Sequence, residues 1–255
     1  MTGNSKYSYI DSGEGKDTLL FIHGFCGSRE YWQKVLPKLK EKYRVIAVDL
    51  RGHGASDSNA GSFSIEDLAE DVALFLEEQS IEKVYLFGHS LGGYITLAFA
   101  ERYPDKLNGF SLVHSTAFPD DEAGKEGRMS SIEKIETAGM PAFIDGLIPK
   151  LFADQDDPHI ELVKKIGYQT RETGAIGSLH AMRNREDKNY VLKDTELPVL
   201  LVAGEKDKVI PPEKTFSVKG KHIREVILES CGHMGMLEAP DQLAREIERF
   251  VEDNK

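Results

Sequence analysis

The chain has 255 residues, a length that fits one large domain or a core with an inserted piece. Hydrophobic residues make up 40% and charged residues 29%, and no apolar run approaches the roughly 20 residues that span a bilayer. The net charge of -11 argues against binding to a nucleic-acid backbone. The N-terminal residues carry no recognisable secretory signal. We therefore expect a cytoplasmic protein with no membrane association and no nucleic-acid partner.

The first part of the sequence alternates apolar runs with amphipathic stretches. A weak alternation over 7–11 predicts an edge strand, and a helix is predicted to begin near Ser28 and to carry Trp32, Val35 and Leu36. The stretches 64–76 and 91–102 have helical spacing. Continuous apolar runs predict buried strands over 18–22, 43–49, 84–87 and 109–114. This alternation of strand and helix predicts an α/β fold, a mostly parallel, doubly wound sheet with helices on both faces.

Residues 117–185 break the alternation. They are rich in charge, show helical periodicity and contain no convincing strand. Strands are predicted again over 198–203 and 224–228, followed by a closing helix over 239–252. We therefore expect a core formed by residues 1–116 and 186–255, with an inserted helical cap over 117–185.

One motif, Gly88-His89-Ser90-Leu91-Gly92, carries the strongest chemical signal. It lies between a predicted strand and a predicted helix, which is the setting of a nucleophile elbow. The glycines allow neighbouring backbone to approach closely, so Ser90 can be presented at a sharp turn beside a helix N-terminus. An ordinary glycine-containing turn is the alternative. We expect Ser90 to be the nucleophile.

A serine nucleophile needs a base, and the base needs an acid that fixes its tautomer. Functional residues of doubly wound sheets collect beyond the carboxyl ends of strands. That rule selects His233 as base and Asp207 as acid, with Asp120 and Asp121 as fallbacks for the acid. Glu205 is a near neighbour of the predicted acid.

Other strand-end residues have different predicted roles. We expect Asp49 and His23 to be structural, and His89 to point away from the reacting atoms. His114 is predicted either to line the pocket or to pack beneath the cap. The backbone N–H groups of Leu91 and Phe25, which follow two different strands, are predicted to form an oxyanion hole.

The sequence resembles the α/β-hydrolase superfamily from about residue 9 to residue 251. The similar motifs are 23–25, 49–56, 88–93, 204–207 and 232–233, and the order Ser90, Asp207, His233 is the one expected of that superfamily. It looks most like the small branch with a helical cap, which holds esterases, lactonases, perhydrolases and carbon–carbon hydrolases. Similar epoxide hydrolases and haloalkane dehalogenases carry Asp where this chain has Ser90. The resemblance implies a shortened N-terminal hairpin.

These features predict a serine hydrolase that cleaves a small carboxylic ester through an acyl-enzyme, with no metal and no organic cofactor. One alternative is a carbon–carbon hydrolase or lyase with the same triad, acting on a carboxylate-bearing molecule that Arg29, Arg183 or Arg185 would face. Another is a weakly hydrolytic small-ligand receptor.

The predicted pocket is only outlined by the sequence. Candidate substrate-binding residues flank the catalytic turns: Trp32, His114, Val209 and Met234, beside Phe25 and Leu91. Cap residues that could close the roof, or simply hold the cap together, are Met140, Phe143, Leu147 and Phe152. Cys26 and Cys231 both adjoin catalytic loops, and we expect free thiols there rather than a disulfide.

Overall fold

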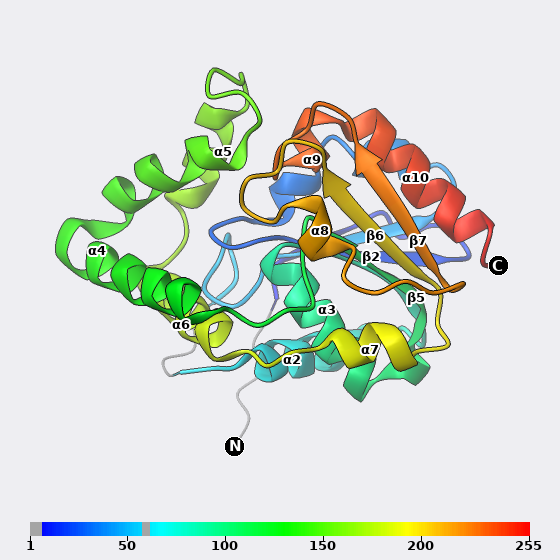
Figure 1. Ribbon diagram of the computed structural model, residues 1–255. Coiled ribbons are helices and arrows are strands. Elements are labelled where there is room, and N and C mark those ends of the chain that lie inside the picture. Colours follow the sequence, from blue (N-terminus) through cyan, green and yellow to red (C-terminus); the bar gives the residue numbers. More distant parts are fainter. Residues whose placement is uncertain (1–6, 58–61) are drawn as a thin grey trace.

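The computed structural model describes residues 7–57 and 62–255 and places a seven-stranded sheet at its centre (Figure 1). The strand order is β1-β3-β2-β4-β5-β6-β7, and every neighbouring pair is parallel except β1 with β3. The strands are β1 (Tyr9–Asp11), β2 (Thr18–Ile22), β3 (Arg44–Val48), β4 (Val84–His89), β5 (Leu107–Val113), β6 (Val199–Gly204) and β7 (Ile223–Leu228). This sheet confirms the predicted α/β-hydrolase fold class.

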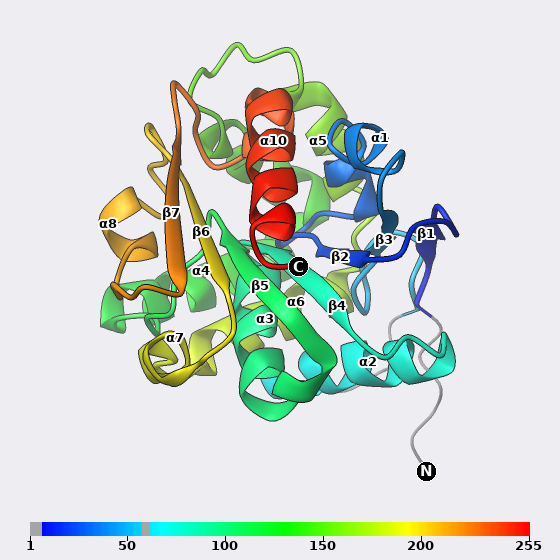
Figure 2. The ribbon, with the colours of Figure 1, turned by 90° about the vertical axis from the view of Figure 1, so that its right-hand side faces the viewer.

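Helices cover both faces of the sheet. Figures 1 and 2 show α1 (Leu36–Leu39) and α10 (Pro240–Glu252) on one face, with α2 (Ile65–Glu78) and α3 (Leu91–Arg102) on the other. Every residue of β2, β4 and β6 is buried. These strands are covered on both sides, which explains why their sequences are continuously apolar rather than alternating.

Local sequence signals account for two of the covering helices. Ser64 and Asp67 form a reciprocal capping box that starts α2. The closing helix α10 buries Leu243, Ile247 and Phe250 at helical spacing, and the Phe250 ring meets Phe87 edge-on at 6.3 Å between centroids. The two helices are therefore fixed by a cap and by an apolar stripe.

The predicted helix near Ser28 is wrong in length. Ser28 does cap a helical turn, but this turn is the short 3-10 helix η1 (Arg29–Trp32), and α1 begins separately at Leu36. Pro37 lies in the first turn of α1. Because proline has no N–H to donate, a helix running through this position would lose a backbone hydrogen bond.

Between β5 and β6 the chain is helical. The elements are α4 (Glu122–Leu147), η3 (Ile148–Leu151), α5 (Ile160–Gly167), α6 (Glu172–Asn184) and α7 (Asn189–Asp194). Helix α4 is broken at Gly139, where φ is 78° and ψ is 167°, and α4 packs against α6. Figure 1 shows α4, α5 and α6 beside the helix layers of the sheet. That residues 117–185 are a cap over a core of 1–116 and 186–255 remains our proposal.

The remaining elements are η2 (Pro104–Lys106), α8 (Pro212–Thr215) and α9 (Gly235–Glu238). Across residues 7–57 and 62–255, no helix combines the length and the apolar character needed to cross a membrane. The N-terminal stretch assessed for a secretory signal lies outside the described residues.

Candidate active site

Ser90 lies at the turn between β4 and α3 in a strained backbone conformation. Its φ of 51° and ψ of -111° lie in a region that L-residues rarely adopt. A Cβ at Gly88 would lie within 2.4 Å of the Gly92 carbonyl, and a Cβ at Gly92 would lie 2.6 Å from the carbonyl oxygen of Ile22. Both glycines are therefore required by close backbone packing, as the sequence motif predicted.

His233 and Asp207 meet from the loops that follow β7 and β6. Nδ1 of His233 lies 2.7 Å from Oδ2 of Asp207, and both side chains are buried. The backbone N–H groups of Val209 and Ile210 donate to the other carboxylate oxygen at 2.8 and 2.9 Å. Burial alone would raise the pKa of Asp207, but the facing His233 and His114 rings hold it well below its usual range.

His114, which follows β5, is a second neighbour of the same carboxylate. The N–H of Gly235 donates to its Nε2 at 3.2 Å, so the ring proton belongs on Nδ1, which lies 3.3 Å from Oδ2 of Asp207. The residue has a φ of 49°, and burial lowers the pKa of its imidazole. Neutral His114 therefore donates to Asp207 and supports it from the side away from the cavity.

The loop that carries His233 is organised by Glu238, a residue that sequence reasoning missed. The Glu238 carboxylate accepts hydrogen bonds from the backbone N–H groups of Gly232, Met234 and Ala153. His233 N–H donates to the Leu151 carbonyl at 2.7 Å. Glu238 follows a glycine-histidine pair by only a few residues, and that proximity is the only signal the sequence offered.

The turn after β2 packs against the elbow. A Cβ at Gly24 would lie 2.6 Å from Nδ1 of His89 and 3.2 Å from the Cβ of Ser90. Nε2 of His89 lies 2.9 Å from the carbonyl of His233, so its ring binds backbone rather than Ser90. The two turns that carry Phe25 and Leu91 are therefore neighbours in space.

His23 and Asp49 have the structural roles expected of them. Nε2 of His23 accepts from the N–H of Leu50 at 2.9 Å, and its Nδ1 lies 2.7 Å from the Gly24 carbonyl oxygen. The Asp49 carboxylate accepts from the backbone N–H of Arg29 at 2.7 Å and pairs with its guanidinium. Both side chains tie the loop after β3 to the turns beside Ser90.

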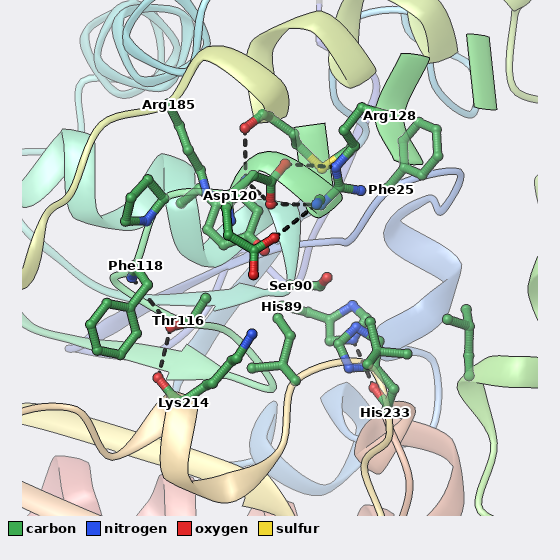
Figure 3. A pocket seen from close by; sticks show the side chains of 18 of the residues that line it. Phe25, His89, Ser90, Thr116, Phe118, Asp120, Arg128, Arg185, Lys214 and His233 are labelled. Carbon is green, nitrogen blue, oxygen red and sulfur yellow. Dashed lines mark hydrogen bonds and ion pairs between the residues drawn. The ribbon is translucent and has the colours of Figure 1, made fainter. Parts of the chain in front are cut away.

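A cavity of about 280 Å³ opens beside Ser90 and His233 (Figure 3). Of the predicted pocket residues, Phe25 and Val209 line it, and Leu147 contributes from α4. Sequence reasoning missed most of the other lining residues, which are His89, Tyr94, Thr116, Phe118, Arg128 and Lys214 among others. The lining is mixed, with aromatic rings and several charged groups.

Three predicted substrate-binding residues do not line this cavity, and their assignment is corrected. Trp32 is fully buried in the core, with its ring 5.0 Å from that of Phe21. His114 is buried beside Asp207, and Met234 is buried in the loop before α9. Among the cap candidates, Met140, Phe143 and Phe152 are also absent from the lining.

The fallback acids Asp120 and Asp121 contact residues of the helical segment over 117–185 instead of a histidine. Asp120 accepts from Nε of Arg128 at 3.0 Å, and Nη1 of Arg185 lies 2.8 Å from its other oxygen. Asp121 caps α4 through the N–H of Gly124. Burial opposes ionisation of Asp120, but the two guanidinium groups lower its pKa. Arg185 is the only one of the three predicted arginines that lines the cavity.

Cys26 and Cys231 are free and buried. Burial raises the pKa of both thiols far above the ordinary value. Neither thiol is therefore suited to act as a nucleophile.

Comparison with known proteins gives relatives of moderate identity over most of the chain. The dihydrolipoyllysine-residue acetyltransferase component of the acetoin cleaving system of Pseudomonas putida is 28% identical over 94% of this chain. The chain spans 64% of that protein's length, which is less than two thirds. The 2-(acetamidomethylene)succinate hydrolase of Mesorhizobium japonicum is 28% identical over 75% of this chain and 72% of its own.

Among solved structures, a thermophilic esterase from Thermogutta terrifontis with malate bound superposes with a TM-score of 0.92. It is 28% identical, and the match covers 97% of this chain and 93% of that one. The family model described as the alpha/beta hydrolase fold matches residues 17–162, which is more than half of the chain. The chain therefore belongs to the alpha/beta hydrolase family.

Proposed function

We propose that this protein is a serine hydrolase that cleaves small carboxylic esters. Ser90 is the nucleophile, His233 the general base and Asp207 the acid that orients His233. The backbone N–H groups of Phe25 and Leu91 form the oxyanion hole. Leu91 is the first residue of α3, so its N–H has no partner within the helix and is free to bind an oxyanion.

The reaction proceeds in two steps that share one geometry. Ser90 Oγ attacks the ester carbonyl while Nε2 of His233 takes its proton, and the two N–H groups bind the oxyanion. Collapse of this intermediate breaks the ester bond, and His233 returns the proton to the departing alcohol. Water then attacks the acyl-enzyme with the same base, and the carboxylic acid leaves with Ser90 restored.

The observation that carries the proposal is the 2.7 Å contact between Nδ1 of His233 and Asp207, because it leaves Nε2 as the nitrogen free to act as base. His233 and strained Ser90 line the same cavity. The relative from Thermogutta terrifontis, an esterase by description, supports the same class of reaction.

Ser90→Ala provides the test. We expect it to lower kcat for a short p-nitrophenyl ester at least roughly a thousandfold, because no nucleophile remains. The protein should stay folded by circular dichroism. Ser111→Ala is the matched control, since the Ser111 hydroxyl in β5 is buried without a hydrogen-bond partner and does not line the cavity. Near-normal turnover by purified Ser90→Ala protein would exclude the proposal.

A second candidate is hydrolysis of a carbon–carbon bond, or a lyase-type elimination, on a carboxylate-bearing substrate with the same triad. Arg128 and Arg185 in the cavity favour it, as does the related hydrolase whose substrate is a succinate derivative. A vinylogous diketone assayed beside the ester separates the two. Rapid cleavage of the diketone with slow ester turnover would favour this second candidate.

A further inference from the structure

Two arginines from the helical segment share one carboxylate at the wall of the cavity. Arg128 comes from α4 and Arg185 follows α6, and Figure 3 shows both reaching toward Asp120. Asp120 and Arg185 are almost fully buried, with side-chain exposures of 9% and 7%. The two guanidinium groups carry two positive charges, and Asp120 supplies one negative charge.

The donors of the two guanidinium groups are not equally occupied. Arg128 directs its Nε and Nη2 edge at Asp120, at 3.0 and 3.5 Å. Arg185 uses Nη1 alone, which donates to the Met182 carbonyl at 2.7 Å and lies beside Asp120. Its Nε is buried without a hydrogen-bond partner. A buried donor without a partner is costly, and Arg185 differs from Arg183, whose Nε is also unpartnered, in lining the cavity.

The charge of the cavity selects the kind of acceptor. Its charged lining residues are Arg128, Arg185 and Lys214 against Asp120 and Asp121, which leaves one net positive charge. The chain as a whole carries -11. A single carboxylate balances this local charge and matches the two parallel N–H groups of a guanidinium edge. A doubly charged phosphate would face the two aspartates with surplus negative charge.

Tyr94 connects Arg185 to the helix that follows Ser90. It lies in the first turn of α3, whose N-cap residue is Ser90, and both residues line the cavity. The guanidinium carbon of Arg185 lies 4.1 Å from the centroid of the Tyr94 ring. Ser90 and Arg185 therefore border the same cavity.

We propose that Arg185, held by Asp120 and Tyr94, binds a carboxylate on the substrate, so that the preferred substrates are short esters carrying a free carboxylate. The inference rests on the proposed esterase function and names its substrate class. Half-esters of short dicarboxylic acids carry the required charge. Arg128 holds Asp120 in place and contributes the second positive charge.

The test compares two esters of the same shape. Monoethyl succinate carries the carboxylate, and ethyl 4-methylpentanoate replaces it with an uncharged branched group. We expect the protein to favour the anionic ester in kcat/KM. Arg185→Gln should lower the ratio of the two kcat/KM values about 10- to 100-fold, mainly through KM for the anionic ester. Arg185→Lys should restore part of the ratio, because it returns charge without the planar edge.

Arg183→Gln is the matched control. Arg183 lies at the end of α6, two residues before Arg185, and does not line the cavity. Its Nη1 donates to the side chain of the neighbouring Asn184. This variant should keep the wild-type ratio. A ratio unchanged by Arg185→Gln, in protein that still hydrolyses the neutral ester, would overturn the carboxylate site and leave the proposed esterase intact.

A binding measurement separates the two proposals when turnover is absent. Succinate titrated into Ser90→Ala protein by calorimetry should bind, and Arg185→Gln in that background should weaken binding at least tenfold. Binding that depends on Arg185 without hydrolysis of either ester would support the carboxylate site and overturn the esterase. Succinate that binds equally well without Arg185 would overturn the site.

Discussion

The loops around Ser90 and the helical segment over 117–185 contribute to one cavity, but their side chains are held in different ways. In the loops, backbone groups fix the side chains: Asp207 accepts two backbone N–H groups, and Glu238 accepts three more beside His233. In the helical segment, Asp120 is held by the side chains of two arginines. Substitutions in the helical segment can therefore change these side chains without disturbing the backbone of the loops.

This difference separates the chemistry from the choice of substrate. Backbone hydrogen bonds depend on the fold and leave little freedom to the groups around Ser90. The ion pairs of Asp120 depend only on side chains carried by α4 and the residue that follows α6. We infer that the loops set the reaction, while the helical segment sets the substrate.

The largest expected effect is a loss of catalysis caused by a substitution in the loops. Asp207→Asn should lower kcat about 10³- to 10⁴-fold, because the amide cannot hold the tautomer of His233 that acts as base. Ester turnover measures this loss of kcat, and circular dichroism checks that the variant is folded. A steep loss of kcat in Asp120→Asn, with kcat retained in Asp207→Asn, would place the catalytic acid in the helical segment. The division of roles between the loops and the helical segment would then be wrong.

A smaller effect is expected on stability, for which one glycine beside Ser90 is compared with one glycine in the helical segment. Gly88→Ala should destabilise the fold by about 3 kcal/mol, because the new Cβ would overlap the Gly92 carbonyl and the Thr96 hydroxyl. Gly127→Ala in α4 should stabilise by about 0.5–1 kcal/mol, since nothing lies within 4 Å and alanine favours helix.

Thermal unfolding measures both variants. A loss of about 3 kcal/mol lowers Tm by roughly 10 °C in a chain of this size, and the gain raises it by about 2 °C. Equal and small shifts for the two glycines would mean that the elbow tolerates a side chain. The argument for tight backbone packing at Ser90 would then fail.

The core of the fold was predictable because its signals are local. Continuous apolar runs marked β2, β4 and β6, and Ser64 marked the start of α2. The division of one predicted helix into η1 and α1 was missed, although Pro37 was visible in the sequence. The break inside α4 at Gly139 was missed as well, although Gly139 and Pro141 were visible in the sequence.

The site was predictable only where its residues follow strands. The contact between Asp207 and His233, and the cavity that Ser90 and His233 share, follow from strand ends meeting at one edge of the sheet. Trp32 was misplaced because closeness in sequence to a catalytic turn does not reveal which way a side chain points. Arg128 was missed because whether it lines the cavity depends on how α4 packs, and nothing in the local sequence encodes that packing.

The last expected effect is the response of stability to pH, which arises in the loops. Burial lowers the pKa of His53 from 6.5 to about 4, and His23, His89 and His114 are lowered in the same direction. Below pH 6.5 these histidines are protonated in the unfolded chain but stay neutral in the folded protein. The free energy of unfolding therefore falls as the pH falls toward 4.

Each such histidine contributes a slope of about 1.4 kcal/mol per pH unit within this window. His53→Gln should remove the contribution of one proton to the slope of the unfolding free energy against pH, between pH 6 and pH 4.5. The glutamine amide can still donate to the Arg51 carbonyl, which Nδ1 of His53 contacts at 3.0 Å. Urea unfolding at several pH values measures the slope. An unchanged slope in His53→Gln would mean that the His53 ring is protonated in the folded protein. The loop that carries His53 would then be less tightly buried than the loops beside Ser90.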